Sequence, residues 1–297
     1  MPTKVNVINT TGFHPENVSA PPYDMTALAE SHPELKALII PNRIEGLTVD
    51  FQNPDAVYHL NKAMLIKYFG IRNWDIAKDS LVPGVPIRSE YLYRMRDFLN
   101  SKKIEGPIKV VDIGTGGNLI YPIIGVGAFN WKFVASDIDQ KSLDNAHAIV
   151  HSNKILDKKI ELRMQNNPAK VFENIILKDE TFHLSICNPP FHANQKEALK
   201  QSMRKQKNLA YKNTKLNFQG RPNELWTAGG EFSFVERMIR ESYYFKSQIN
   251  YFSTLVSKNE NLAPLIKILT DIKVTTIDII EMEQGNKKSR ILIWNWN

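Results

Sequence analysis

Residues 109–117 read KVVDIGTGG, an apolar run that stops at a cluster of glycines. The run is long enough for one buried strand, and the glycines allow the chain to turn sharply after it. Four further apolar runs follow, and segments with helical spacing fall between several of them. Such alternation predicts a mostly parallel sheet covered by helices on both faces. The further strands are expected at 132–138, 159–164, 181–187 and 250–256, and the helices at 140–153, 231–245 and 262–271.

Both ends of the chain depart from this alternation. Two extended segments, 274–283 and 289–296, are joined by a glycine-containing turn at 284–287, which is typical of an antiparallel hairpin. Residues 1–105 are irregular and punctuated by proline. We therefore predict a small, mainly helical N-terminal domain over 1–105 and an α/β domain over 106–297 that ends in antiparallel strands. The N-terminal helices are expected at 26–36, 54–69 and 89–99.

The composition limits the class of protein and its partners. The chain has 297 residues, is 42% hydrophobic and carries a formal charge of +7 with a pI near 9.2. A folded, basic protein of this kind favours an anionic partner. The one cysteine, Cys187, excludes an intramolecular disulfide and fits a reducing compartment. Because no apolar run approaches the roughly 20 residues of a membrane span and residues 1–4 lack a signal-peptide core, we expect a cytoplasmic protein. We also expect a monomer, although the residues leave the oligomeric state open.

The glycines after the first strand are candidates for a cofactor site. Gly114 and Gly116 allow the backbone to approach a ligand closely, and Asp112 stands just before them. The pattern is not that of a dinucleotide site, because Leu119 stands where a third glycine or an alanine is needed. Asp137, 25 residues after Asp112, falls at the tip of the second strand, where a carboxylate can accept both hydroxyl protons of a ribose. The set favours S-adenosylmethionine, whose amino-acid end Asp112 can meet.

A second candidate site follows the strand at 181–187, where the chain reads Asn188-Pro189-Pro190-Phe191. An exocyclic amine is a poor nucleophile because its lone pair is delocalised into the ring. The Asn188 amide oxygen and a neighbouring backbone carbonyl can each accept one N–H, which frees the lone pair for attack. Proline supplies a carbonyl without a competing N–H, and the Phe191 ring can stack on a base. We expect Asn188 to contact the cofactor as well. Together with the cofactor residues, the motif predicts the sheet of a class I Rossmann-like methyltransferase.

Residues 192–228, which follow the motif, indicate the substrate. This insertion holds eight basic side chains against two acidic ones, a net charge of +6 out of the chain's +7. Tyr211, Phe218 and Trp226 are interleaved with them. Basic side chains can contact the phosphates of a single-stranded RNA, and aromatic side chains can stack on its bases. The alternative interpretation is a solvated loop whose charge only aids solubility. RNA contacts are expected from Lys200, Arg204, Lys205, Lys207 and Lys212.

Two other patterns are less specific. Arg88 precedes a predicted helix, where its guanidinium can reach a cofactor carboxylate or a phosphate. His147 and His151 have metal-ligand spacing on a predicted helix, but no third ligand accompanies them, so surface histidines are the better interpretation. We therefore predict no metal site.

Several sequence blocks besides 188–191 are informative together. They are His14-Pro15 with Tyr23-Asp24; Val49-Asp50-Phe51; Leu60-Asn61, Gly70-Ile71 and Trp74-Asp75-Ile76; Asp112-Ile113-Gly114 with 120–125; 187–193; Leu216-Asn217-Phe218; Glu224-Leu225-Trp226; Gly229-Gly230-Glu231; and Leu255-Val256-Ser257-Lys258. On these blocks, spread over residues 13–296, the chain resembles the RlmF family. These are bacterial 23S rRNA adenine-N6 methyltransferases, related to the eukaryotic enzymes that methylate an adenine in a spliceosomal small nuclear RNA.

The resemblance implies S-adenosyl-L-methionine as cofactor and large-subunit rRNA, free or in a ribosome assembly intermediate, as partner. It implies that 188–191 form the catalytic motif, that Gly114 and Asp137 contact the cofactor and that Arg88 reaches toward it. It also implies RNA contacts by 192–228, with the N-terminal domain as an accessory RNA-contacting unit. The chain departs from the family pattern at 16–22, at 81–86 and at Leu119, which bears on the RNA contacts more than on the chemistry.

Other functions stay open on the residues alone. A DNA-adenine or protein-glutamine methyltransferase can use the same grip on a planar amine, and a non-catalytic RNA-binding protein can use the same fold. The charge of 192–228 and the family blocks favour methylation of the N6 amine of an adenine in large-subunit rRNA. The target base is expected to be unpaired or flipped, because its amine cannot be reached inside a helix.

Overall fold

The computed structural model describes residues 2–42, 46–77, 80, 82–190, 229–284 and 287–297. Its strands are β1 (Lys4–Thr11), β2 (Ile39–Pro41), β3 (Leu47–Val49), β4 (Lys109–Ile113), β5 (Lys132–Asp137), β6 (Ile160–Met164), β7 (Phe182–Cys187), β8 (Ile249–Val256), β9 (Thr276–Gln284) and β10 (Lys287–Asn295). Its helices are α1 (Met25–Ser31), α2 (Pro54–Phe69), α3 (Val85–Ser101), α4 (Ile120–Phe129), α5 (Gln140–Ser152), α8 (Gly230–Ser242) and α9 (Asn259–Asp271), with 3-10 helices η1 (Pro33–Leu38), η2 (Lys154–Leu156) and η3 (Tyr243–Phe245).

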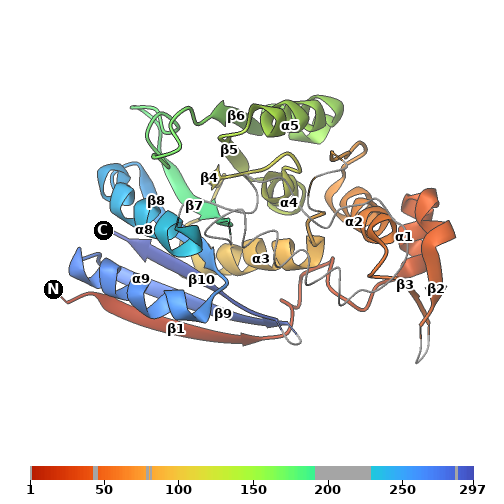
Figure 1. The fold of residues 1–297 in the computed structure, drawn as a ribbon, viewed down its shortest axis with the longest axis horizontal. Helices are drawn as coiled ribbons and strands as arrows, with labels where there is room; N and C mark the ends of the chain where they lie inside the picture. The colour runs from red at the N-terminus through yellow and green to blue at the C-terminus, as the bar shows by residue number, and fades with distance from the viewer. Residues whose placement is uncertain (1, 43–45, 78–79, 81, 191–228, 285–286) are drawn as a thin grey trace.

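One large sheet forms the centre of the molecule (Figure 1). Within the described residues it has eight strands in the order β1-β9-β10-β8-β7-β4-β5-β6, and β2 and β3 form a separate pair. The strands from β8 to β6 are parallel, whereas β10 runs antiparallel to both β8 and β9. The predicted fold class, a mostly parallel sheet that ends in an antiparallel hairpin, is therefore confirmed.

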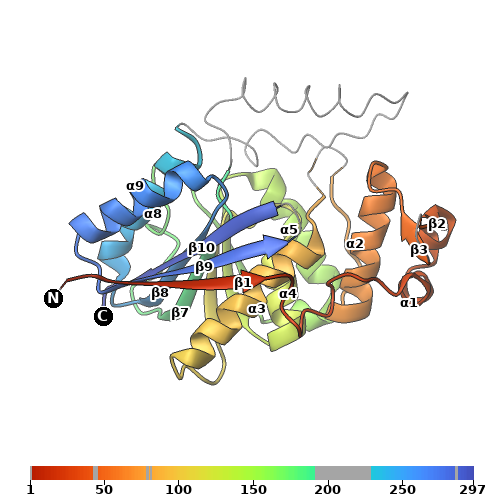
Figure 2. The same cartoon turned by 90° about the horizontal axis from the view of Figure 1, so that it is seen from below.

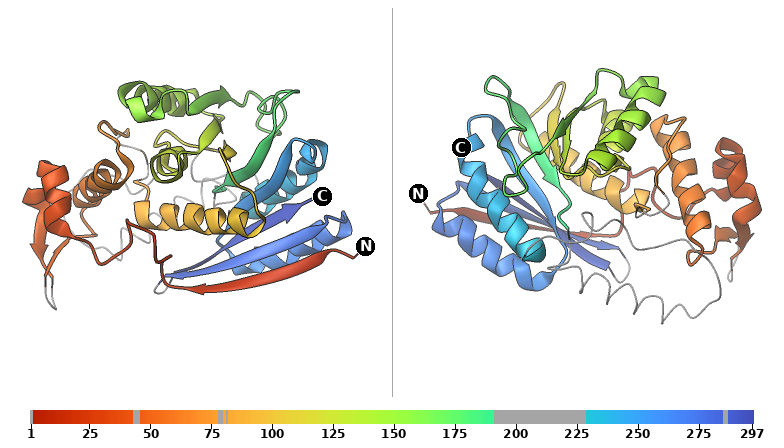
Figure 3. Two further views of the ribbon diagram at one scale, coloured as in Figure 1. Left: turned by 180° about the vertical axis from the view of Figure 1, so that it is seen from behind. Right: turned by 45° about the horizontal axis from the view of Figure 1, so that its top comes forward.

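Helices cover both faces of this sheet (Figures 1 and 3). On one face α8 and α9 pack buried side chains such as Met238 and Leu269 against Phe252 of β8. On the other face α3 and α4 pack buried side chains such as Leu92 and Ile124. The result is a three-layer sandwich, which is the arrangement that parallel sheets require in order to bury both faces.

Local sequence accounts for the ends of α2, which is the longest predicted helix of the N-terminal part. Pro54 occupies its first turn, and the Asn53 side chain accepts the Asp55 N–H at 3.0 Å. Gly70 ends the helix with a φ of 70°, a left-handed conformation that glycine adopts without strain. The prediction of a helix over 54–69 is confirmed.

Several elements differ from the prediction. α3 begins at Val85 and not at residue 89, so Arg88 lies in its first turn and does not precede it, and the short elements β2, β3 and η2 were not expected. The helix expected over 26–36 ends at Ser31, and η1 begins at Pro33, because proline lacks the N–H and crowds the preceding turn. α4 was not expected, since Gly125 and Gly127 lower the helical propensity of an otherwise apolar segment. β1 was not expected either, because its partner strand, β9, is far away in the chain: Lys4 pairs with Thr276.

The N-terminal part contacts the rest of the molecule through β1 and α2 as well as through α3. β1 is the edge strand and pairs in parallel with β9, so the N-terminal end of β1 and the C-terminal end of β10 lie on the same side of the molecule (Figure 2). The C-terminal end of α2 lies against α4, where a Cβ at Gly127 would meet the Phe69 carbonyl oxygen at 2.6 Å and its Cα at 2.8 Å. The division of the chain at residue 105 stays a prediction.

This close approach generates the first prediction. Gly127→Ala is expected to lower the free energy of unfolding by about 1–3 kcal/mol, because the methyl group would push the backbones of α2 and α4 apart. Urea denaturation followed by circular dichroism measures this change in the free energy of unfolding. Gly84→Ala is the control for the added methyl group, since a Cβ there meets nothing within 4 Å. Gly84 is the N-cap of α3, where alanine is less favourable than glycine, so this change should cost only about 0.5 kcal/mol. Equal effects of the two substitutions would contradict the close packing of α2 on α4.

Candidate active site

The predicted site residues follow three neighbouring parallel strands. The register pairs Ile113 at the end of β4 with Ser136 of β5 on one side and with Cys187 of β7 on the other. Gly114, Asp137 and Asn188 come directly after these positions, so the structure brings the three together at the carboxyl edge of the sheet. This edge is where parallel α/β sheets bind their ligands.

The loop after β4 is held against β5. The N–H groups of Gly114 and Thr115 both donate to the Ser136 carbonyl at 2.9 Å, and the Gly116 N–H donates to Asp137 Oδ2 at 2.8 Å. Gly114 and Gly116 have φ values of 73° and 66°. A Cβ on Gly114 would meet no atom of the described residues within 4 Å, so its backbone borders open space into which a ligand can fit.

Asp112 is the buried charged group at the centre of this edge. Its side chain is 1% exposed, and neither carboxylate oxygen has a hydrogen-bond partner within the described residues. Burial raises its pKa to about 7, the neighbouring Thr115 hydroxyl opposes this rise, and the charge of Asp137 adds to it. A carboxylate in this position lacks only a cationic or hydrogen-bonding partner, which a ligand can supply.

Further polar atoms at this edge are buried in the same way. Thr115 Oγ1, the Tyr121 hydroxyl and Asn188 Oδ1 are inaccessible to solvent and make no well-formed hydrogen bond in the described part of the chain. Thr115 lies near Asp112, and Tyr121 lies near Arg88. The Arg88 guanidinium lies 5.8 Å from the centre of the Tyr121 ring. Burial raises the pKa of Tyr121, an effect that the positive charge of Arg88 opposes and that Asp112 adds to.

Tyr121 and Thr115 are site residues that the sequence reasoning missed. The signal for Tyr121 was its place in the block at 120–125, where one hydroxyl stands in an apolar segment. Tyr121 also packs edge-on against Tyr91 of α3, with ring centres 5.6 Å apart. The Tyr91 hydroxyl in turn lies 2.8 Å from Ser253 Oγ in β8, so the polar site rests on a rigid, buried support.

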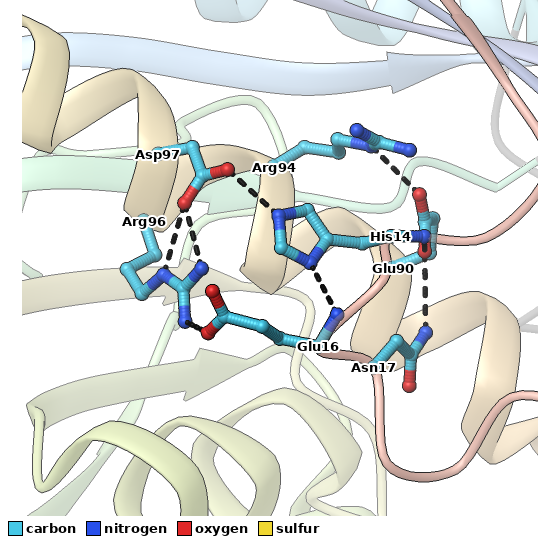
Figure 4. A network of polar contacts seen from close by, with 7 residues as sticks. All are labelled: His14, Glu16, Asn17, Glu90, Arg94, Arg96 and Asp97. Atoms are coloured by element: carbon cyan, nitrogen blue, oxygen red, sulfur yellow. Dashed lines mark hydrogen bonds and ion pairs between the residues drawn. The ribbon is translucent and has the colours of Figure 1, made fainter.

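A buried network fixes the helix that carries Arg88 (Figure 4). Glu90, fully buried, accepts the His14 N–H at 2.7 Å and the Asn17 amide at 3.2 Å, while its other oxygen accepts from Arg94 at 2.7 Å. The Asn17 amide also donates to the Pro86 carbonyl at 3.0 Å. The segment after β1 therefore holds the first turns of α3, and with them Arg88, against the sheet.

Not every predicted residue can be located. Phe191 lies outside the described residues. The predicted RNA contacts also lie outside them, namely Lys200, Arg204, Lys205, Lys207 and Lys212. Pro189 is buried and Pro190 half-buried after β7. The roles of all predicted site residues stay predictions.

The remaining candidates are unremarkable. His147 and His151 lie exposed on α5. Within the described ranges, no group of three His, Cys, Asp or Glu side chains is arranged to hold a metal ion. None of the helices in the described part of the chain is long and apolar enough to cross a bilayer.

Comparison with known proteins identifies the family. A family model described as RNA methyltransferase matches residues 7–297. The chain belongs to this RNA methyltransferase family. The family resemblance expected from the sequence blocks is confirmed.

Curated relatives of this RNA methyltransferase span almost the whole chain. A protein of Christiangramia forsetii named Ribosomal RNA large subunit methyltransferase F is 45% identical over 286 residues, which cover 96% of this chain and 100% of that protein. A protein of Flavobacterium johnsoniae with the same name is 45% identical over 294 residues, covering 96% of this chain and 93% of that protein.

Solved structures support the same fold. The hMettl16 catalytic domain in complex with the MAT2A 3'UTR hairpin 6 superposes with a TM-score of 0.79 at 28% identity, covering 96% of this chain and 98% of that one. The N-terminal domain of human METTL16 in complex with SAH has a TM-score of 0.77 at 24% identity, covering 97% and 100% of the two chains.

The polar atoms at the sheet edge fit the methyl donor of an RNA methyltransferase, S-adenosylmethionine, whose use by this family member is confirmed. We expect the unpaired Asp112 carboxylate to hold the donor's ammonium group and Arg88 its carboxylate. Asp137 is the candidate acceptor for the ribose hydroxyls. The cofactor supplies an activated methyl group, and these residues would bind and orient it.

The buried Asp112 generates the second prediction. Its pKa is raised from 3.8 to about 7, so ionisation opposes folding and the stability that this group contributes is lost as the pH rises between these values. Asp112→Asn should therefore stabilise the ligand-free protein more at pH 8 than at pH 5, by about 2 kcal/mol. The same substitution should weaken cofactor binding. Urea denaturation and calorimetry measure the two effects.

Asp144→Asn is the matched control for this prediction. Asp144 is exposed on α5, so its replacement should change stability equally at both pH values. A stability change for Asp112→Asn that does not depend on pH would contradict the raised pKa of Asp112.

Proposed function

We propose that this protein transfers a methyl group from S-adenosylmethionine to the exocyclic N6 amine of an adenine in large-subunit rRNA. One observation carries the proposal: Asn188 Oδ1 is buried without a partner among the described residues, one strand away from the equally unpaired Asp112 carboxylate. An unpaired acceptor next to a cofactor site is suited to receive an N–H from the group to be methylated.

The proposed chemistry needs little from the protein beyond positioning. Asn188 Oδ1 and the Pro189 carbonyl would each accept one N–H of the amine, which turns its lone pair toward the methyl carbon. The amine then attacks this carbon while the carbon–sulfur bond breaks, and the product ammonium releases its proton to water. Stacking of the base on Phe191 would keep it in the plane required by the two hydrogen bonds.

Three observations support RNA as the substrate. The two relatives from Christiangramia and Flavobacterium are named as methyltransferases of large-subunit ribosomal RNA. The hMettl16 neighbour was solved with an RNA hairpin. In the present chain, 192–228 places a net charge of +6 directly after Phe191, and basic side chains supply most of the affinity for a phosphate backbone. The partner would be rRNA, free or in an assembly intermediate, in the cytoplasm.

The third prediction concerns the grip on the amine. Asn188→Ala is expected to reduce methyl transfer by about 100-fold or more, because an electrostatic contact of the transition state is lost. Binding of S-adenosylhomocysteine, measured by calorimetry, should largely survive. Asn100→Ala, at an exposed asparagine near the far end of α3, is the control and should retain full activity. Near-normal turnover by Asn188→Ala would rule out the grip.

The substrate itself is tested by supplying labelled S-adenosylmethionine with unmodified large-subunit rRNA, with DNA and with a protein extract. Nuclease digestion and mass spectrometry then locate the label. N6-methyladenosine in the rRNA sample supports the proposal. Label at another base position, in DNA or on a protein glutamine would contradict the proposal and identify a different amine as the substrate.

The fourth prediction concerns the basic insertion. Replacement of Arg204, Lys205 and Lys207 together by glutamine should weaken RNA binding and flatten its dependence on salt by about two to three units of log–log slope. Filter binding at several salt concentrations measures both quantities. Replacement of Lys132, Lys158 and Lys159, at the opposite end of the sheet, removes the same charge and is the control. An unchanged slope for the insertion variant would exclude its proposed contact with phosphates.

A further inference from the structure

The block at 70–76 contacts the loop of residues 114–119 after β4, which we call the cofactor loop. The buried indole of Trp74 donates its Nε1–H to the Asn118 carbonyl at 2.9 Å. Trp74 belongs to the connection between α2 and α3, about 40 residues before the loop in the chain. The N-terminal part therefore reaches the backbone of the cofactor loop directly.

A side chain of α5 bridges the same block and the same loop with two hydrogen bonds. The Asn145 amide, on α5, donates to the Gly117 carbonyl at 2.6 Å and to the Asp75 carbonyl at 3.0 Å. Gly117 lies beside α5, since a Cβ there would make an ordinary contact with Ser142 Cα at 3.4 Å. Two consecutive carbonyls of the loop, those of Gly117 and Asn118, are thus each bound by a side chain from outside the loop.

The loop needs such support because its backbone is intrinsically permissive. Gly114, Gly116 and Leu119 all have positive φ values, of 73°, 66° and 54°. Glycines lose the most conformational entropy when they are fixed, and a left-handed leucine is strained. The bonds to Ser136 and Asp137 hold the first half of the loop, and those from Trp74 and Asn145 hold the second half, where α4 begins.

Trp74 is itself rigidly placed. Its ring stacks on Tyr58 of α2 with the centres 5.6 Å apart and the planes 16° apart. The Tyr58 hydroxyl donates to Asp75 Oδ1 at 2.7 Å, and Lys62 donates to the same oxygen at 2.8 Å. The indole N–H therefore points at the loop from a fixed support, as a positioning group should.

We infer that Trp74 is a positioning residue for cofactor binding, with Asn145 as its partner on α5. Trp74 acts through the Asn118 carbonyl and fixes the second half of the loop in the conformation that receives the donor's amino-acid end. This inference rests on the cofactor site of the proposed function. It does not depend on which nucleotide is methylated.

The fifth prediction tests this role with two tryptophans. Trp74→Phe removes the indole donor and should raise the Kd for S-adenosylhomocysteine about 3- to 10-fold in calorimetry. It should also raise the KM for S-adenosylmethionine and leave the KM for RNA unchanged. Trp294→Phe is the matched control, because Trp294 is equally buried and donates its Nε1–H to Ser242 Oγ at 2.9 Å, away from the loop. It should lower the melting temperature but leave the Kd unchanged.

Asn145→Ala keeps the test informative if Trp74→Phe does not fold. Asn145 is half-buried, and its replacement removes the bond to Gly117 with little loss of packing. A wild-type Kd in these variants, or a Kd raised as much by Trp294→Phe, would overturn the inference. Wild-type protein that binds S-adenosylhomocysteine but methylates no RNA would instead overturn the proposed function and leave the role of Trp74 intact.

Discussion

The parallel pairing of β4 with β5 and β7 is the constraint on which the site depends. Parallel strands present their carboxyl ends at one edge, so residues that are 25 and 76 positions after Asp112 in the chain come to lie beside it. Helices cover both faces of these strands. As a result the first polar residues after each strand are both close together and shielded from water.

The buried polar groups at this edge lower the stability of the ligand-free protein but favour ligand binding. Buried polar atoms without partners, such as the Asp112 carboxylate and the Asn188 amide oxygen, are unfavourable in the ligand-free protein. Two apolar clusters, one on each face of the sheet, offset this penalty. A site whose polar groups are held in place before the ligand arrives loses little conformational entropy on binding.

The N-terminal part of the chain supports this site as well as adjoining it. β1 extends the sheet, the segment containing His14 and Asn17 holds α3 through Glu90, and Trp74 binds the cofactor loop. The sequence suggested an accessory unit for contacts with RNA. The hydrogen bonds within the described residues join this unit, in addition, to α3 and to the loop after β4, next to the candidate cofactor site.

Local chemistry alone determined the strand–glycine–aspartate pattern around Asp112, the second acidic strand end at Asp137 and the motif at Asn188. It also determined the helix over 54–69 and the terminal hairpin, because periodicity, capping residues and turn residues act within a few positions. Only the tertiary structure decided the pairing of β1 with β9, the formation of α4 despite its glycines, and the contacts of Tyr121, Glu90 and Trp74. Each of these depends on burial against segments distant in the chain, and no local pattern encodes which distant atoms will be near.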